Sequence, residues 1–251
     1  KRINNHFSNP MKIFLILGIV SSFIFFLPLF STPIYILRAD QAFDNAYNPV
    51  FGGDWHNEIE TKIKSKFFMP KQFQLTGYFL GIENPNCIAI HDILYFNGSQ
   101  SVYTVDHDIK LYFNAYLPPN QGIGLPGENS TLIRIHGGGW TIGDKGRYNV
   151  NMMNRYFAAQ GYCVFDIQYG LNNESSLFQH IPGTPENVLG NFTIGDMLRH
   201  IGNFTKYLAS HAHLYGANLD SVFISGGSAG GQLTSATALS ISEGNYSLFS
   251  N

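Results

Sequence analysis

Hydrophobic residues form one long uninterrupted run near the N-terminus of this 251-residue chain. Residues 13–37 contain no charged side chain and lie between Lys12 and Arg38. About 20 apolar residues are enough for a helix to span a bilayer. The run therefore predicts a transmembrane helix that anchors the protein, with a cleaved secretory signal and a buried core helix as the alternatives. Pro28 and Pro33 are expected to kink or end this helix.

The segments on either side of the run indicate its orientation. Residues 1–12 form a short flank that carries positive charge, which favours a cytoplasmic N-terminus and places the rest of the chain outside the cell or in a lumen. A secreted protein is the alternative if the run is cleaved. Residues 38–86 predict a linker or a cap over an active site. Within them, apolar residues recur every four positions over 54–68, which predicts a short amphipathic helix.

From residue 87 onward, short apolar segments alternate with longer ones in which apolar residues recur every three or four positions. The short segments predict strands and the longer ones predict helices. The expected strands are 88–96, 109–117, 131–135, 162–167 and 222–224, and the expected helices are 147–160, 192–210 and 232–239. The first two strands predict an antiparallel pair. The alternation after them predicts a mostly parallel sheet flanked by helices, which is an α/β fold.

Composition excludes some classes of partner and cofactor. Charged residues make up only 13% of the chain and the formal net charge is −2, so no basic patch is available for nucleic acid. Cys87 and Cys163 are too few for a disulfide framework. His107 lies between Asp106 and Asp108, as in some metal sites, but no further ligand follows at a suitable spacing. We expect a turn at this position and predict no metal site.

The strongest chemical signal directly follows the expected strand at 222–224. The chain continues as Gly226-Gly227-Ser228-Ala229-Gly230, a Gly-x-Ser-x-Gly pattern that leads into a helix. Because Gly226 and Gly230 lack side chains, the strand and the helix can approach closely and expose the Ser228 hydroxyl at the positive end of the helix. The pattern predicts a nucleophilic serine. An ordinary helix N-cap, the alternative, needs no glycine on both sides.

A second glycine run, His136-Gly137-Gly138-Gly139-Trp140, directly follows the expected strand at 131–135. Acyl transfer requires backbone amides aimed at the oxyanion of the tetrahedral intermediate, and glycines let such amides approach the substrate. With both motifs in this order, residues 90–242 resemble the α/β-hydrolase superfamily, and in particular its hormone-sensitive-lipase-like carboxylesterase branch. The resemblance implies an α/β-hydrolase fold and a serine carboxylesterase or lipase that uses no cofactor. Its substrates would be esters of small or medium acyl chains.

The resemblance also implies roles for individual residues. Ser228 would carry the acyl group, and the amides of Gly138, Gly139 and Ala229 would form the oxyanion hole.

The remaining motif residues would support this site. His136 and Gly137 would shape the glycine loop, and Trp140 would pack beside the acyl pocket. One residue departs from the family pattern: Gly170 replaces the arginine that the family commonly has between tyrosine and leucine.

The general base and its acid partner are not evident in the sequence. In α/β-hydrolases both follow the serine along the chain. After Ser228, Glu243 is the only acid and there is no histidine. His211 and His213 come before the expected strand at 222–224. We interpret residues 87–251 as the N-terminal part of a hydrolase domain that is incomplete at its C-terminus. The chain alone is then expected to be inactive.

Two alternatives to an esterase remain open. A catalytically inactive hydrolase-fold domain would serve as a binding or adhesion module, and an amidase or peptidase would use the same scaffold. Six Asn-x-Ser/Thr sequons are consistent with an extracytoplasmic glycoprotein, although chance also produces sequons in an asparagine-rich chain. They begin at Asn97, Asn129, Asn173, Asn191, Asn203 and Asn245.

Overall fold

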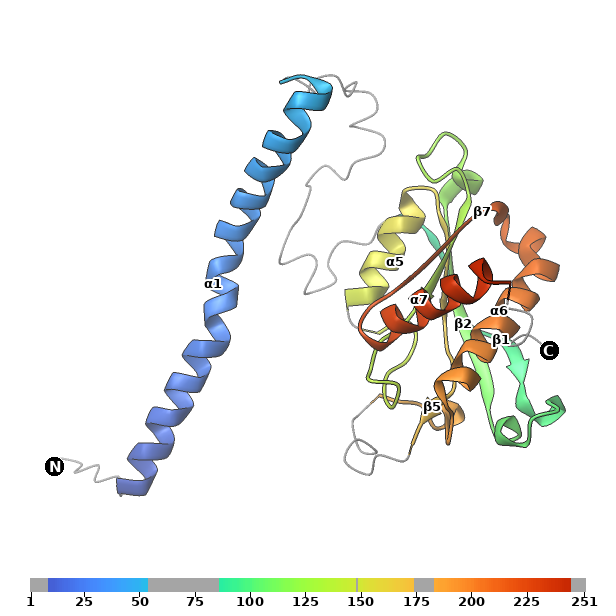
Figure 1. The fold of residues 1–251 in the computed structure, drawn as a ribbon, viewed down its shortest axis with the longest axis horizontal. Coiled ribbons are helices and arrows are strands. Elements are labelled where there is room, and N and C mark those ends of the chain that lie inside the picture. Colours follow the sequence, from blue (N-terminus) through green and yellow to red (C-terminus); the bar gives the residue numbers. More distant parts are fainter. Residues whose placement is uncertain (1–8, 54–85, 148, 174–182, 245–251) are drawn as a thin grey trace. The chain divides into compact units, whose positions relative to one another are not determined.

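The computed structural model describes residues 9–53, 86–147, 149–173 and 183–244 (Figure 1). The chain divides into two units, Lys1–Lys66 and Phe67–Asn251. The helix expected over 54–68 lies outside the described residues.

The first unit contains one long helix, α1 (Asn9–Phe51). It continues beyond Pro28 and Pro33. The expectation that these prolines would end the helix is therefore wrong. Each proline removes one hydrogen bond from the ladder, and the bonds of the neighbouring turns can carry the helix past that gap. The segment Pro10–Leu27 has a mean hydropathy of 2.2 and is long and apolar enough to cross a membrane, a criterion that a signal sequence also meets.

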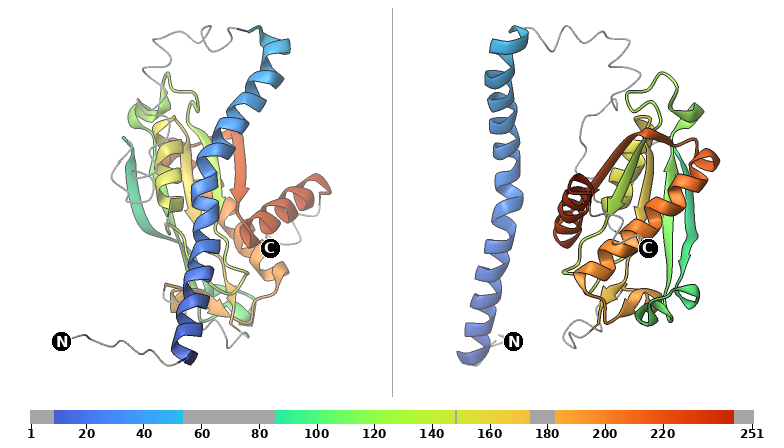
Figure 2. Two further views of the ribbon diagram at one scale, coloured as in Figure 1. Left: turned by 90° about the vertical axis from the view of Figure 1, so that its left-hand side faces the viewer. Right: turned by 45° about the vertical axis from the view of Figure 1, so that its right-hand side comes forward.

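The second unit is built on a five-stranded sheet with the order β1-β2-β4-β3-β7 (Figures 1 and 2). Its strands are β1 (Ile88–Asn97), β2 (Lys110–Leu117), β3 (Ser130–Ile135), β4 (Cys163–Ile167) and β7 (Asn218–Gly226). The expected antiparallel pair is confirmed in β1 and β2, and β4 also lies antiparallel to β2. β3 runs parallel to both β4 and β7, which confirms the parallel part of the prediction.

Helices cover both faces of the sheet. They are α5 (Asn149–Ala159), α6 (Ile194–Tyr215) and α7 (Ala229–Ser242). Because successive strand residues point to opposite faces, Phe165 packs in the large core with α6 and α7, whereas Val164 packs in a smaller core with Ala158 of α5. The short elements, which the sequence did not predict as strands or helices, are η1 (Gly98–Gln100), η2 (Thr104–Asp106), η3 (Pro119–Gly122), β5 (Leu171–Asn172), η4 (Glu186–Val188) and β6 (Leu189–Gly190).

Local capping explains where α6 begins and ends. The Thr193 hydroxyl accepts a hydrogen bond from the Asp196 amide at 3.2 Å, and the Asp196 carboxylate accepts one from the Thr193 amide at 2.9 Å. This reciprocal capping box satisfies two amides that the first turn leaves without partners. At the other end, Gly216 adopts a left-handed conformation with φ of 64° and stops the helix.

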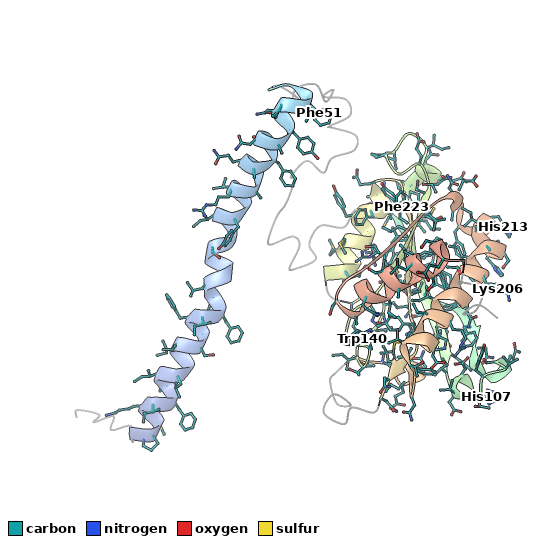
Figure 3. The ribbon with its side chains drawn as sticks, in the orientation of Figure 1. Phe51, His107, Trp140, Lys206, His213 and Phe223 are labelled. Atoms are coloured by element: carbon teal, nitrogen blue, oxygen red, sulfur yellow. The ribbon has the colours of Figure 1, made fainter. Side chains whose placement is uncertain are left out.

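β7 is an edge strand of the described sheet. Among the described residues it pairs only with β3. Several of its large apolar side chains are about half exposed, with fractions of 43% for Leu219, 48% for Val222 and 52% for Phe223, which is labelled in Figure 3. This strand leads directly into the Gly-x-Ser-x-Gly turn.

Candidate active site

The turn between β7 and α7 holds Ser228 in a strained backbone conformation. Only two residues separate the end of β7 at Gly226 from the start of α7 at Ala229. Ser228 has φ of 54° and ψ of −126°, a region that residues with a side chain rarely occupy. Its side chain is exposed and makes no capping hydrogen bond to the helix. The hydroxyl is therefore presented at the helix N-terminus without serving as an N-cap.

The glycines of this turn permit contacts that any larger residue would block. A Cβ on Gly226 would lie 2.4 Å from the carbonyl oxygen of Gly230. A Cβ on Gly230 would lie 2.3 Å from the carbonyl oxygen of Ile135 and 2.5 Å from that of His136. Real Cβ atoms do not approach backbone oxygens so closely, so the first turn of α7 can rest on the end of β3 only because these positions are glycine.

This packing brings the two glycine-containing motifs together. β3 and β7 are parallel neighbours with Ile135 opposite Gly226, so both strands deliver their following loops to the same edge of the sheet. A Cβ on Gly137 would lie 3.2 Å from the Cβ of Ser228. Residues 136–140, which we call the glycine loop, thus lie directly against the serine.

The glycine loop has an unusual backbone. Gly138, Gly139 and Trp140 have φ angles of 129°, 59° and 64°, all in the region that favours glycine. The Trp140 side chain is 37% exposed and is labelled in Figure 3. Adopting a left-handed conformation at a tryptophan costs about 1 kcal/mol, so neighbouring contacts must hold this residue in place.

Hydrogen bonds to the loop carbonyls determine where its amides point. The Gly137 carbonyl accepts from His136 Nδ1 at 2.8 Å, and the Gly138 carbonyl accepts from the amides of Thr141 and Ile142 at 3.2 and 3.0 Å. A trans peptide places its N–H opposite its carbonyl, so the amides of Gly138 and Gly139 point away from these partners.

The amide of Ala229, at the start of α7, is a third backbone donor of the same kind. Within the described residues, the amides of Gly138, Gly139 and Ala229 donate no hydrogen bond to another residue. Three backbone donors near the serine are thus available to a ligand, as an oxyanion hole requires.

His136 has a structural position at the base of the loop. It is buried, its ring stacks on Tyr169 with 4.5 Å between ring centroids, and burial lowers its pKa so that the imidazole is neutral. Because the Gly137 carbonyl can only accept, Nδ1 carries the proton that it shares with this oxygen. This nitrogen is therefore not available to act as a base.

Two further histidines lie far from the serine. His211 and His213 belong to the last turns of α6, before β7 begins. β7 then runs for nine residues, roughly 30 Å at 3.3 Å per residue, before it reaches the serine turn. Figure 3 shows His213 on the far side of the domain from Trp140.

One charged network in the first half of α6 was not predicted from the sequence. Asp106, expected only to form a turn, is fully buried and accepts hydrogen bonds from both Arg199, through Nη2 at 2.9 Å, and His200, through Nε2 at 3.1 Å. These partners hold the pKa of Asp106 well below its usual range, although burial acts in the opposite direction. A signal was present: Arg199 and His200 interrupt the apolar face of the helix between Leu198 and Ile201.

The same network accounts for the glycine at position 170. A Cβ at this position would lie 2.6 Å from the Phe192 ring and 2.7 Å from the His200 ring. The Gly170 amide donates to His200 Nδ1 at 3.1 Å. Together with the bond to Asp106, this contact engages both ring nitrogens of His200, which is therefore a structural residue.

The carboxylesterase family matches residues 82–251. No curated protein matches the sequence.

Among solved structures, an inhibited esterase B from Lactobacillus rhamnosis is 27% identical over 61% of this chain and 40% of its own, with a TM-score of 0.44. Its tributyrin phosphonate form is 25% identical over 66% of this chain and 44% of its own, with a TM-score of 0.46. Est2, a thermophilic esterase from the Planctomycetes species Thermogutta terrifontis, is 21% identical over 61% of this chain and 44% of its own, with a TM-score of 0.41. The chain thus spans less than half the length of these esterases.

The family match covers the whole sheet, both motifs and the helices around them, in the order expected for an α/β-hydrolase fold. This chain belongs to the carboxylesterase family.

Proposed function

We propose that the protein is a serine carboxylesterase of the hormone-sensitive-lipase-like branch and that Ser228 is its nucleophile. The contact between Gly137 and Ser228 carries the proposal, because it places an exposed hydroxyl beside a loop of free backbone amides. The positive φ of Ser228 supports it further, because strained backbone conformations cluster at active sites, where the surrounding structure holds them in place.

In the proposed reaction, Ser228 Oγ attacks the ester carbonyl carbon and loses its proton to a general base. The carbonyl π electrons move to the oxygen, which becomes an oxyanion held by the amides of Gly138, Gly139 and Ala229. Collapse of this intermediate releases the alcohol, which takes up the proton, and leaves an acyl-enzyme. Water then repeats these steps and releases the acid.

The fold supports the charge that develops in this reaction. Ser228 immediately precedes α7, whose N-terminus carries a partial positive charge near the developing oxyanion. Loss of one oxyanion donor typically costs about 10²–10³ in rate. We assign the general base to a histidine outside the described residues, since the described histidines at 136 and 200 are engaged elsewhere. No step uses a cofactor.

The proposed substrates are esters of small or medium acyl chains. The chain is 15% aromatic and only 13% charged, which suits an apolar acyl pocket. We assign Trp140 to that pocket, because it directly follows the loop glycines and part of its ring is exposed.

A fluorophosphonate probe tests the proposal on the full-length protein that contains this sequence. Only an activated serine reacts with the probe, so we expect labelling of the wild type and none of Ser228→Ala. Ser235→Ala is a matched control, because Ser235 lies exposed on α7 in the same helix. An unlabelled wild type would favour the inactive binding or adhesion module instead. Hydrolysis of anilides but not of esters would favour the amidase alternative.

We further propose that α1 anchors the protein in a membrane and that the hydrolase domain is extracytoplasmic or lumenal. The apolar segment Pro10–Leu27 supports the anchor. Among the sequons at described residues, Asn191 is the exposed one, so we expect glycosylation there first. Resistance of the membrane fraction to carbonate extraction, together with a glycosidase-sensitive mass shift that Asn191→Gln reduces, tests both parts.

A further inference from the structure

We infer that Tyr169 is a positioning residue for the oxyanion hole, an inference that rests on the proposed function. The Tyr169 hydroxyl donates a buried hydrogen bond of 2.8 Å to the carbonyl oxygen of His136. His136 opens the glycine loop, and its own ring is stacked on the Tyr169 ring. Tyr169 therefore touches both the backbone and the side chain at the base of the loop.

The hydrogen bonds form a relay from Tyr169 to the donor amides. The Tyr169 hydroxyl fixes the peptide between His136 and Gly137, and His136 Nδ1 fixes the next peptide through the Gly137 carbonyl at 2.8 Å. The N–H opposite that carbonyl belongs to Gly138, one of the three proposed oxyanion donors. Removing the hydroxyl would release the first peptide of this relay and so change the direction of the Gly138 amide.

A second contact holds the other end of the loop. The Asn172 amide donates to the Trp140 carbonyl at 2.8 Å. Tyr169 and Asn172 lie three residues apart, so one short segment supports both ends of residues 136–140. Trp140 occupies the strained left-handed region, which makes such a contact necessary for a single loop conformation.

The supporting segment, residues 168–172, is itself rigidly held. The Gln168 amide donates to the Tyr112 carbonyl at 2.9 Å, and the Gly170 amide donates to His200 Nδ1 at 3.1 Å. Leu171 and Asn172 pair as β5 with β6. Contacts from β2, α6 and β6 thus converge on this segment, which can hold the glycine loop in place because it is fixed on several sides.

Burial keeps the Tyr169 hydroxyl in its donor form. Tyr169 is fully buried, and burial raises its pKa far above the physiological range. The phenol therefore remains protonated at every pH at which an esterase is assayed.

The test compares Tyr169→Phe with Tyr207→Phe in the full-length protein. Tyr207 is the matched control: its hydroxyl is hydrogen-bonded to the Tyr215 hydroxyl at 3.3 Å, a bond within α6 that involves neither the glycine loop nor residues 168–172. Both variants keep the aromatic ring and lose one hydrogen bond. We expect both to fold, with a lower midpoint of thermal unfolding than the wild type.

The kinetic outcomes should differ between the two variants. With p-nitrophenyl butyrate, Tyr169→Phe should lower kcat about tenfold or more and leave KM within about twofold, because the oxyanion exists only in the transition state. It should weaken inhibition by a trifluoromethyl ketone, which forms a tetrahedral oxyanion with the serine, by the same factor. Tyr207→Phe should change none of these values by more than about twofold.

A second variant, at His136, tests the same relay in case Tyr169→Phe does not fold. His136→Phe keeps a ring that can stack on Tyr169 but removes the bond to the Gly137 carbonyl, so it should show the same loss of kcat and of inhibitor affinity. Wild-type kcat and ketone affinity in Tyr169→Phe and His136→Phe would overturn the inference. If instead the wild type shows no hydrolysis that depends on Ser228, the proposed function itself fails, which is a different result.

Discussion

Arg199 donates hydrogen bonds to both carboxylate oxygens of Asp106, a residue 93 positions earlier in the chain. The pair joins the loop between β1 and β2 to the first half of α6, and both side chains are almost completely buried. His200 adds a third contact to the same carboxylate, and its other ring nitrogen holds Gly170. A purely structural charge cluster thus lies behind the segment that supports the glycine loop.

Replacing Asp106 should be strongly destabilising. Asp106→Ala leaves the buried guanidinium of Arg199 without this partner, and breaking a buried pair in this way typically costs about 3–5 kcal/mol. Urea unfolding monitored by circular dichroism measures the change in the free energy of unfolding. Asp220→Ala, at an exposed aspartate, is the control and should change it by less than about 0.5 kcal/mol. Equal effects of the two substitutions would contradict the assigned role of the cluster.

The stability of the domain should depend on pH through Asp166. This residue is fully buried on β4, where its carboxylate accepts from the Gly146 amide at 2.6 Å and from Asn154 Nδ2 at 2.9 Å. Burial nevertheless raises its pKa to about 6. Between pH 4 and 6 the folded state therefore binds a proton that the unfolded state has lost, so the contribution of Asp166 to stability falls as pH rises.

Asp166→Asn isolates this contribution. The free energy of unfolding of the wild type, relative to that of the variant, should decrease by about 2.4 kcal/mol from pH 4 to pH 7, since each unit of pKa shift is worth about 1.36 kcal/mol and a small part of the effect is already lost at pH 4. Other titrating groups, including Asp106, are common to both proteins and cancel in the difference. Urea unfolding at pH 4, 5, 6 and 7 measures the two curves. Parallel curves would show that the pKa of Asp166 is not raised.

Gly230→Ala should damage both stability and the proposed chemistry. The added Cβ would meet the carbonyl oxygens of Ile135 and His136 at 2.3 and 2.5 Å, so α7 must move away from β3. Overpacking of this kind costs about 1–3 kcal/mol, and the movement would also separate Ser228 from the glycine loop. Thermal unfolding and fluorophosphonate labelling measure the two effects.

The control for this substitution is Gly195→Ala in the first turn of α6. The nearest atom to its added Cβ is Thr193 Oγ1 at an ordinary 3.6 Å. Alanine is the better helix former, so this variant should be at least as stable as the wild type and should be labelled normally. Normal labelling of Gly230→Ala would show that the close approach of α7 to β3 is not required.

The capping box of α6 should contribute measurably to stability. Thr193→Ala removes the hydroxyl that accepts from the Asp196 amide, and loss of such a cap typically costs about 1 kcal/mol. Thr193→Ser keeps the hydroxyl and should stay within a few tenths of a kcal/mol of the wild type. Chemical denaturation of the three proteins distinguishes them. A serine variant as unstable as the alanine variant would mean that the methyl group, not the hydroxyl, is important.

Periodicity predicted the central strands well because each is short, apolar and bounded by turn residues. The strand before the serine turn was placed too late, at 222, because Asn218, Asp220 and Ser221 are polar. β7 can begin at Asn218 because its first residues lie at the exposed edge of the sheet, where polar side chains remain in water.

The candidate site was predictable only as far as its chemistry is local. The glycines around Ser228 signal a tight turn in any context, so the motif can be found without a structure. The role of Tyr169 cannot be found in this way, because its bond to His136 joins residues 33 positions apart through the packing of a buried ring. Asp106 was interpreted as a turn residue for the same reason, since its partners lie on a distant helix.

Backbone N–H and C=O groups along the outer edge of β7 face no other strand of the described sheet, and half-exposed apolar side chains accompany them. A second molecule could add its own strand there and remove those side chains from water. In dilute buffer this domain by itself should be prone to oligomerise and precipitate. Oligomers seen during purification would then reveal the unpaired edge of β7 before any assay of Ser228 is made.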